Sequence, residues 1–232
     1  MRNNIWKPIL SSVAIIFLCL VVFVLVKGVK SQESNSQNTS SEVEAIRRGG
    51  LKEAARIKRH YVSNTNTSYW MKYDLESLTK NSVGIIIGVP VSNASQLTAD
   101  GQFITTEYQV KVRESIKGSF LPDEIVRVSL PGGKVVFEDG TSAEIKTPDL
   151  ERMESGKTYT LFLSQTKNTD GGFNLTGGGQ GLFELSTDKS IVKPHGHDKD
   201  IVQKYKNKNT EEFLDEIRAA VRKHPEVSVC CN

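Results

Sequence analysis

One long apolar run, Ile9–Val26, stands apart from the rest of the chain because it contains no charged residue. A helix of about 18 residues rises roughly 27 Å, close to the ~30 Å hydrocarbon core of a bilayer. Lysine or arginine flanks the run on both sides, at positions suited to the two membrane interfaces. The pattern predicts one transmembrane helix over residues 9–27, preceded by a short tail over residues 1–8.

The same segment is either an uncleaved anchor or a cleaved signal peptide. The residues after Val26 match the small-residue cleavage signature poorly, and the run is long for a signal peptide, so we favour the anchor. The first residues are too few to form a domain, which favours a cytoplasmic N-terminus and an extracytoplasmic remainder. The sequence therefore predicts a single-pass protein of the cell membrane, or a secreted protein if the segment is cleaved.

Two further segments separate this run from the main domain. Residues 28–41 are rich in serine, asparagine and glutamine and predict a flexible linker. Residues 42–73 combine a helical apolar pattern with a second polar break, and Gly49–Gly50 interrupts the helix. The basic face of this helix either lies against anionic lipid or is solvated, and we favour the solvated interpretation.

After these segments the apolar pattern becomes that of strands. Val83–Val91 is a continuous branched apolar run, typical of a strand that is buried on both faces. Residues 105–115 alternate apolar and polar positions, which predicts a half-buried strand with Tyr108 on its buried face. A strand over residues 125–130 and a hairpin around Asp139–Gly140 follow.

A glycine run at residues 177–181 lies between two short predicted strands, 173–176 and 182–185, which follow a buried strand at Tyr159–Leu163. A phosphate-binding loop requires Lys-Ser or Lys-Thr after the glycines and then a helix, and this chain has neither there. We therefore interpret the glycine run as a bulge or corner between strands.

A capping pair, Asn209 and Glu212, opens a final helix with one apolar stripe. Several short strands with regular turns and few helices favour a small β-barrel over a sandwich. The predicted fold is therefore mainly β. It is an OB-like barrel with a C-terminal amphipathic helix over residues 74–224, with short flanking N-terminal helices and a tail over residues 225–232.

The strand series resembles that of the netrin-like domain, the OB-type barrel shared with the tissue inhibitors of metalloproteinases. The resemblance covers roughly residues 74–186 and rests on the motifs NSVGIIIGVPV, TTEYQVKVRESIKG, DEIVRVSLPGG, ESGKTYTLFL and GGFNLTGG. The chain is also similar in outline to bacterial exported or membrane-anchored proteins built from an anchor, a barrel and a C-terminal helix. The inhibitors chelate zinc through a free N-terminal cysteine that the predicted domain lacks, so the resemblance implies a fold and no inhibitory residue.

Charge and cysteine content narrow the function classes. Thirty basic and 27 acidic side chains give a formal net charge of +3, too balanced for a dedicated nucleic-acid binder. Cys19 falls in the apolar run, and Cys230 and Cys231 are adjacent near the C-terminus. We interpret that pair as reactive thiols of a frayed tail, while a strained disulfide ring, soft-metal binding, an interchain bridge and lipidation stay open.

The densest set of possible metal ligands is the segment Pro194–Asp200. His195, His197 and Asp198 are its candidate metal-binding residues, because imidazole and carboxylate groups bind zinc, copper and nickel. Proline and glycine beside them predict a mobile, solvated loop instead, which we favour, and no cofactor is expected. Gly-x-Ser-x-Gly and His-Glu-x-x-His are both absent and the carboxylates are scattered, so we predict no catalytic residue and do not expect an enzyme.

The sequence thus favours a membrane-anchored, extracytoplasmic binding module of the cell envelope whose partner is a protein or a polymer. We expect contact through a barrel face or through the rim segments 92–103 and 131–148, since function concentrates in loops on a rigid scaffold. The alternatives are a regulator or inhibitor of an envelope protease and a hydrolase with an unrecognised site. Nucleic acid is not expected, because no basic groove with stacking aromatic residues is visible.

Overall fold

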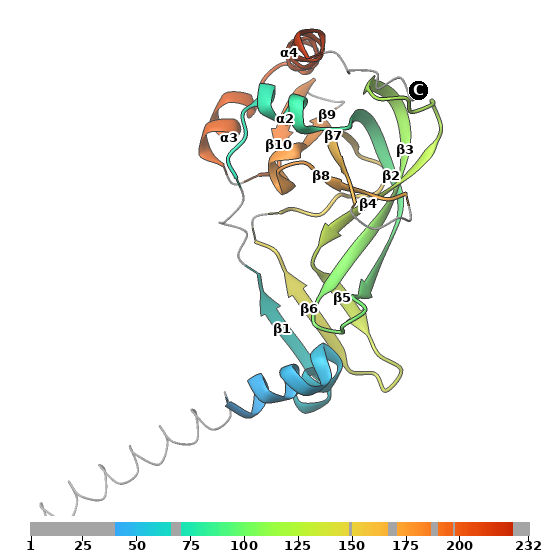
Figure 1. The fold of residues 1–232 in the computed structure, drawn as a ribbon, viewed down its shortest axis with the longest axis vertical. Coiled ribbons are helices and arrows are strands. Elements are labelled where there is room, and N and C mark those ends of the chain that lie inside the picture. Colours follow the sequence, from blue (N-terminus) through green and yellow to red (C-terminus); the bar gives the residue numbers. More distant parts are fainter. Residues whose placement is uncertain are drawn as a thin grey trace, which may run out of the picture.

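The computed structural model describes residues 40–65, 71–148, 150–166, 171–186, 190–196 and 198–224. Over these residues the protein is mainly β, with ten strands in two sheets (Figure 1). The predicted membrane helix over residues 9–27 and the C-terminal tail lie outside the described residues. Within the described part, no helix is both long and apolar enough to cross a membrane.

The larger sheet has seven strands in the order β10-β9-β7-β2-β3-β4-β8. Its strands are β2 (Gly84–Leu97), β3 (Ile104–Lys117), β4 (Ile125–Pro131), β7 (Thr158–Gln165), β8 (Phe173–Leu175), β9 (Leu182–Ser186) and β10 (Ile191–Pro194). Neighbouring strands are antiparallel except β4 and β8, which are parallel. Because β8 also pairs with β7, the pairings β2–β3–β4–β8–β7 return to β2.

The smaller sheet has three strands in the order β1-β6-β5, namely β1 (His60–Asn64), β6 (Ser142–Lys146) and β5 (Gly133–Val136). β1 is parallel to β6, whereas β5 is antiparallel to it. The far end of the β2–β3 hairpin and the helix over residues 40–58 pack beside this sheet (Figure 1). Their shared core contains apolar side chains from each part: Leu51, Ala54, Ala55, Tyr61, Ile104, Ala143 and Ile145.

Alternate residues of β2 and β7 face two separate cores, which explains why the buried parts of these strands are continuously apolar. Ile86 of β2 and Leu161 of β7 belong to the inner core, together with Tyr108 of β3. Ile85 and Phe162 belong to the outer core on the other face of the same strands. The predicted burial of β2 on both faces is confirmed at these isoleucines, which are fully buried.

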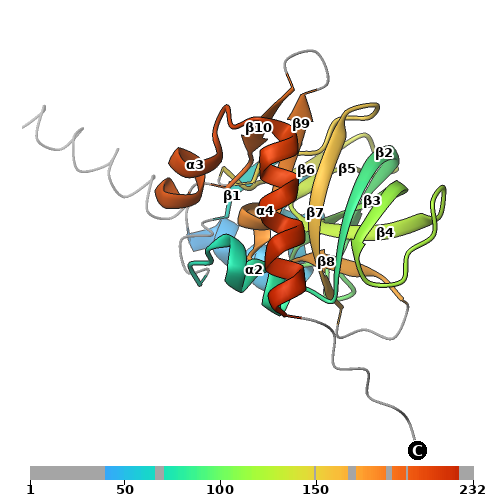
Figure 2. The same ribbon diagram turned by 90° about the horizontal axis from the view of Figure 1, so that it is seen from above.

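Three helices cover the outer core: α2 (Leu75–Asn81), α3 (Lys199–Tyr205) and α4 (Thr210–Lys223). Figure 2 shows α4 lying lengthwise over the larger sheet. The predicted N-cap Asn209 is confirmed, because its side chain accepts a hydrogen bond of 2.9 Å from the Glu211 amide. Asp74 caps α2 in the same way and accepts a hydrogen bond of 2.7 Å from the Ser77 amide.

The glycine run forms a turn and a short 3-10 helix, η1 (Gly178–Gly181), between β8 and β9. This agrees with its interpretation as a corner between strands. The buried side chain of Gln180 donates to the Met71 carbonyl and accepts from the Tyr73 amide, both at 2.9 Å. The corner therefore holds the segment that enters α2 against the larger sheet.

Two segments differ from the sequence expectation. Residues 92–103 were expected to form a loop, but β2 continues to Leu97 and the chain returns as β3 from Ile104. The turn between them is held by the helix over residues 40–58, since the Leu51 amide donates to the Gly101 carbonyl at 2.9 Å. Residues 60–64, expected within the helical or linker segment, form β1, because they pair with β6 far along the chain.

Candidate functional site

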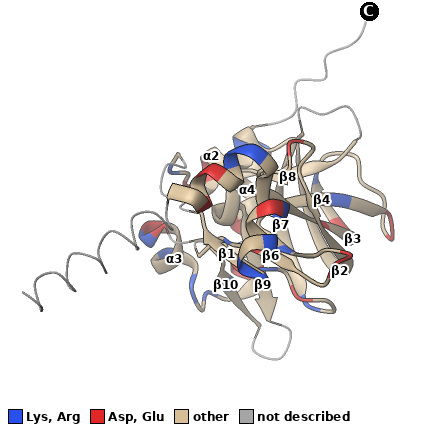
Figure 3. Ribbon diagram, turned by 90° about the horizontal axis from the view of Figure 1, so that it is seen from below, with Lys and Arg blue, Asp and Glu red and all other residues tan. Residues whose placement is uncertain are grey.

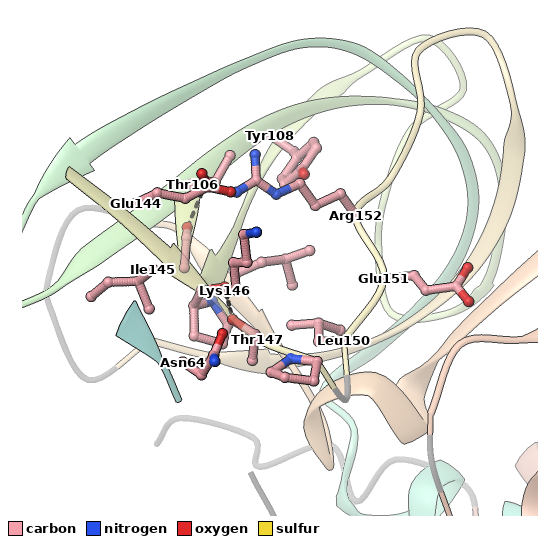
Figure 4. A pocket seen from close by; sticks show the side chains of 14 residues that line it. Asn64, Thr106, Tyr108, Glu144, Ile145, Lys146, Thr147, Leu150, Glu151 and Arg152 are labelled. Carbon is pink, nitrogen blue, oxygen red and sulfur yellow. Dashed lines mark hydrogen bonds between the residues drawn. The ribbon is translucent and has the colours of Figure 1, made fainter. Parts of the chain in front are cut away.

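A cleft of about 320 Å³ lies between the two sheets (Figure 4). Its lining comes from β3, β4, the ends of β1 and β6, and the connection that follows β6. The predicted rim segment 131–148 supplies much of this lining, including Pro131, Gly132 and residues 144–148. The other predicted rim segment, 92–103, contributes no lining residue.

Hydroxyl groups hold the walls of the cleft together. The Thr106 hydroxyl on β3 donates to the Gly132 carbonyl at 2.7 Å. The Ser95 hydroxyl on β2 lies 2.9 Å from the Thr106 hydroxyl. The Thr147 hydroxyl donates to the Pro131 carbonyl at 3.1 Å (Figure 4). These bonds tie the smaller sheet and the connection after it to β3 and β4. The chain's own hydrogen bonds therefore hold the walls of the cleft in place.

Four charged side chains line the cleft: Glu144 and Lys146 on β6, and Glu151 and Arg152 on the following connection. Glu144 and Lys146 share one face of the smaller sheet because they are two positions apart on a strand. Figure 4 shows the Arg152 guanidinium pointing toward Glu144 and Tyr108. Glu151 pairs with Lys193 at 2.8 Å, whereas Glu144, Lys146 and Arg152 form no ion pair with another described residue.

Tyr108 forms the floor of the cleft and is 1% exposed. Burial raises the pKa of its hydroxyl, and the Arg152 charge and a backbone hydrogen bond with Met153 act in the opposite direction. The hydroxyl therefore stays protonated at neutral pH. It serves as a hydrogen-bonding group and not as a general base.

One part of the lining is apolar and includes Leu130, Pro131 and Leu150, while Asn64 and Glu151 add polar groups. Neither histidine nor cysteine is among the described residues that line the cleft. A hollow with an apolar wall and a few placed polar groups has the character of a binding site.

A second polar cluster lies next to the cleft, around His195. The imidazole is 3% exposed, with Nδ1 3.4 Å from a Glu151 oxygen and Nε2 3.4 Å from a Glu184 oxygen, and neither nitrogen forms a hydrogen bond in the described structure. Desolvation lowers the pKa of His195, while the two carboxylates oppose that shift. The ring packs edge-on against Tyr159, with centroids 5.6 Å apart. His195 is therefore a buried packing residue between the connection after β6 and β9.

The structure places the predicted metal ligands in different settings. The nitrogens of His195 face separate carboxylates, and Asp198 caps α3 by accepting from the Asp200 amide at 2.9 Å. His197 lies outside the described residues. The described residues contain no group of three His, Cys, Asp or Glu side chains arranged to hold a metal ion, and a site that includes His197 stays a prediction. The expected solvation of this loop is wrong for His195, because its ring packs against Tyr159.

Charges of both signs are interspersed over the rest of the described structure (Figure 3). A hollow of about 360 Å³ beside α3, for example, is lined by Lys72 and Asp198, whose charged groups lie 3.7 Å apart. Arg47 and Arg48 on the first helix both pair with Glu44. These basic residues are therefore partly neutralised within the chain, in line with the balanced net charge.

No protein-family model matches this sequence, and no curated protein matches it either. The cleft itself was partly predictable, since Tyr108 was expected on a buried face and residues 131–148 were expected at a rim. Asn64 of β1 and Arg152 were missed. Each lies in a polar stretch of sequence, and only folding brings the two residues to the same cleft.

Proposed function

We propose that this chain is a membrane-anchored, extracytoplasmic binding module of the cell envelope, built on an OB-like barrel, with an envelope protein or polymer as its partner. The cleft carries this proposal. It gathers Glu144, Lys146 and Arg152 around the buried Tyr108 ring, and none of these three charged groups forms an ion pair with another described residue. Unpaired charges at a fixed concave site are available to a partner.

The strand pairings support the barrel part of the proposal. Five strands pair in the circuit β2–β3–β4–β8–β7, with β4 parallel to β8. The OB fold is a five-stranded Greek-key barrel that binds oligosaccharides and oligonucleotides at the face of its second and third strands. In this circuit β3 and β4 take those positions, and both line the cleft. This support is an analogy at the level of fold.

The anchor part of the proposal rests on the apolar run at residues 9–27. A membrane-impermeant maleimide added to intact cells tests it, because Cys230 and Cys231 lie after that run. Labelling of intact cells, lost in a variant with both cysteines changed to serine, is the expected result. Labelling that requires permeabilised cells contradicts the proposed orientation.

Capture from solubilised envelope extracts tests the cleft. The full chain is compared with the double variant Lys146→Gln and Arg152→Gln, which removes two cleft cations while keeping polar side chains. We expect the retained partner to fall by about tenfold. A matched variant, Lys52→Gln with Lys80→Gln, removes two exposed cations that do not line the cleft and should capture as the wild type does. Equal capture by all three proteins argues against the cleft.

A further inference from the structure

β1 is an edge strand of the smaller sheet, with β6 on one side and no strand on the other in the described part of the chain (Figure 1). Alternate residues of β1 form the backbone hydrogen bonds to β6. The same pattern continues just after β1, where the Thr65 amide donates to the Lys146 carbonyl at 2.8 Å. The backbone groups of the intervening residues point outward. These outward amides and carbonyls have no hydrogen-bond partner among the described residues, and they belong to His60, Val62 and Asn64.

This free edge adjoins the cleft. Asn64, the last residue of β1, lines the cleft and is paired in register with Lys146 of β6. Val62 is paired in register with Glu144 on the same face and is 41% exposed. Natural edge strands are usually blocked by lysine, proline or a bulge, and β1, which reads HYVSN, has no lysine or proline and pairs with β6 without a register shift.

We propose that β1 binds an extended acidic segment of a partner protein as an added strand, with a carboxylate of that segment in the cleft beside Lys146 and Arg152. This inference rests on the proposed function, because it uses the same cleft, and it names the partner as a peptide. In strand addition, backbone hydrogen bonds supply affinity and alternate side chains supply selectivity.

The register of β1 sets the side-chain pattern of that segment. An added strand lies about 4.8 Å from β1 and roughly 9.6 Å from β6. An apolar side chain fits beside the exposed Val62, since cross-strand apolar neighbours stabilise a sheet. The next side chain on the same face lies beside Asn64, where a carboxylate comes within reach of the long Lys146 side chain. The segment therefore carries an apolar and an acidic residue separated by one position.

A second copy of this chain is the competing occupant of a free edge. Antiparallel pairing of two β1 strands about Val62 places His60 of one copy opposite Asn64 of the other. HYVSN contains no carboxylate, so such a pairing brings no acidic β1 side chain to Lys146 and Arg152. Glu144 also lines the cleft, but it lies in register with Val62, at the apolar position of the added strand, whereas Lys146 lies in register with Asn64. An acidic peptide satisfies the backbone edge and brings its carboxylate to Lys146, which favours it over the second copy.

The test uses the full chain in detergent micelles and two fluorescent heptapeptides built otherwise of threonine and serine. One carries valine at its third and glutamate at its fifth position, and the other has these two exchanged, so that both strand directions are sampled. We expect one of them to show a saturable rise in anisotropy. Its affinity should fall by about tenfold when glutamine replaces the glutamate or when the protein carries Lys146→Gln.

N-methylation of the peptide that binds decides whether β1 is the docking edge. Alternate peptide amides point to β1 and away from it, so the two alternating sets have different roles. Methylation of one set should weaken binding by about tenfold or more, while methylation of the other set changes the affinity by less than about twofold. This comparison leaves the protein unchanged, so a folding defect cannot produce the result.

Three results overturn the inference. If both methylated sets bind equally, β1 is not the docking edge, although continued dependence on glutamate and Lys146 leaves the proposed function standing. If neither peptide binds while envelope capture still depends on Lys146 and Arg152, the cleft holds a polymer or a different protein surface. If light scattering shows a dimer that Val62→Lys dissociates, β1 belongs to an interface between copies.

Discussion

Lys117 is a charged residue at the end of a strand, and it is only 9% exposed. Its ammonium donates to the carbonyls of Thr79 at 2.8 Å and Ser82 at 2.6 Å, at the C-terminal end of α2. Carbonyls at a helix C-terminus lack intrahelical donors and carry partial negative charge, so a cation there satisfies both needs. At the scale of single residues, Lys117 thus fixes α2 to the end of β3.

Replacing Lys117 with methionine keeps the apolar stem and removes these donors. We expect the free energy of unfolding to fall by about 2 kcal/mol, because buried carbonyls lose charged partners. Urea unfolding followed by circular dichroism measures the change. Lys80→Met, at an exposed position in the last turn of α2, should stay within about 0.5 kcal/mol of the wild type, and an equally small effect at Lys117 would disprove its anchoring role.

Gly50 occupies a position where the backbone conformation and a close neighbour both require glycine. Its φ is +65°, and a Cβ built on it lies 2.4 Å from the Gly101 carbonyl oxygen. We expect Gly50→Ala to destabilise the protein by about 2 kcal/mol or more, since it combines a left-handed backbone with a backbone clash. Gly156→Ala is the matched control, because Gly156 has φ +83° with open space around it. Thermal unfolding of both variants separates the cost of the left-handed backbone from the cost of the clash with Gly101. Equal decreases in the melting temperature would show that the contact with Gly101 is unimportant.

At the scale of elements, the start of α2 depends on one carboxylate. The Asp74 side chain accepts hydrogen bonds from the Ser77 hydroxyl and amide, and these lower its pKa. Substituting Asp74 by alanine should cost about 1 kcal/mol at pH 7. The control Asp74→Asn keeps an acceptor and should recover most of that loss.

The pH dependence of this cap has a definite sign. The folded-state pKa of Asp74 lies below the unfolded value of about 3.9, so the ionised cap contributes fully above that value. Its contribution is lost as the pH falls through the folded-state pKa. The stability difference between the wild type and Asp74→Ala should therefore shrink as the pH falls below about 4. A difference that stays constant over this range contradicts the role of the charge.

Elements whose determinants are local were predictable from the sequence. The cap at Asn209 and the apolar run of β2 required only neighbouring residues. β1 was not predictable in this way, because its pairing partner β6 lies far along the chain and HYVSN has no strong strand pattern. The burial of His195 likewise depends on Tyr159, Glu151 and Glu184, which come from distant segments.

At the scale of the whole molecule, the relation between the two sheets creates the cleft. The circuit of five strands presents β3 and β4 at one end, and the smaller sheet packs there through β5, which contacts both β2 and β3. Hydrogen bonds at Thr106 and Thr147 close the junction. The rim segment 131–148 and the hairpin around Asp139–Gly140 within it were predicted, whereas the place of that hairpin in a separate sheet was not, because that sheet needs β1.

The most direct test of the binding cleft is site-specific photo-crosslinking in intact cells. A photoreactive phenylalanine analogue is placed at Asn64, an exposed residue that lines the cleft, or at Lys80, on α2. We expect a discrete adduct of higher mass, formed on irradiation at Asn64 and absent or much weaker at Lys80. No adduct at Asn64, or equal adducts at both positions, would contradict the claim that the cleft holds the partner.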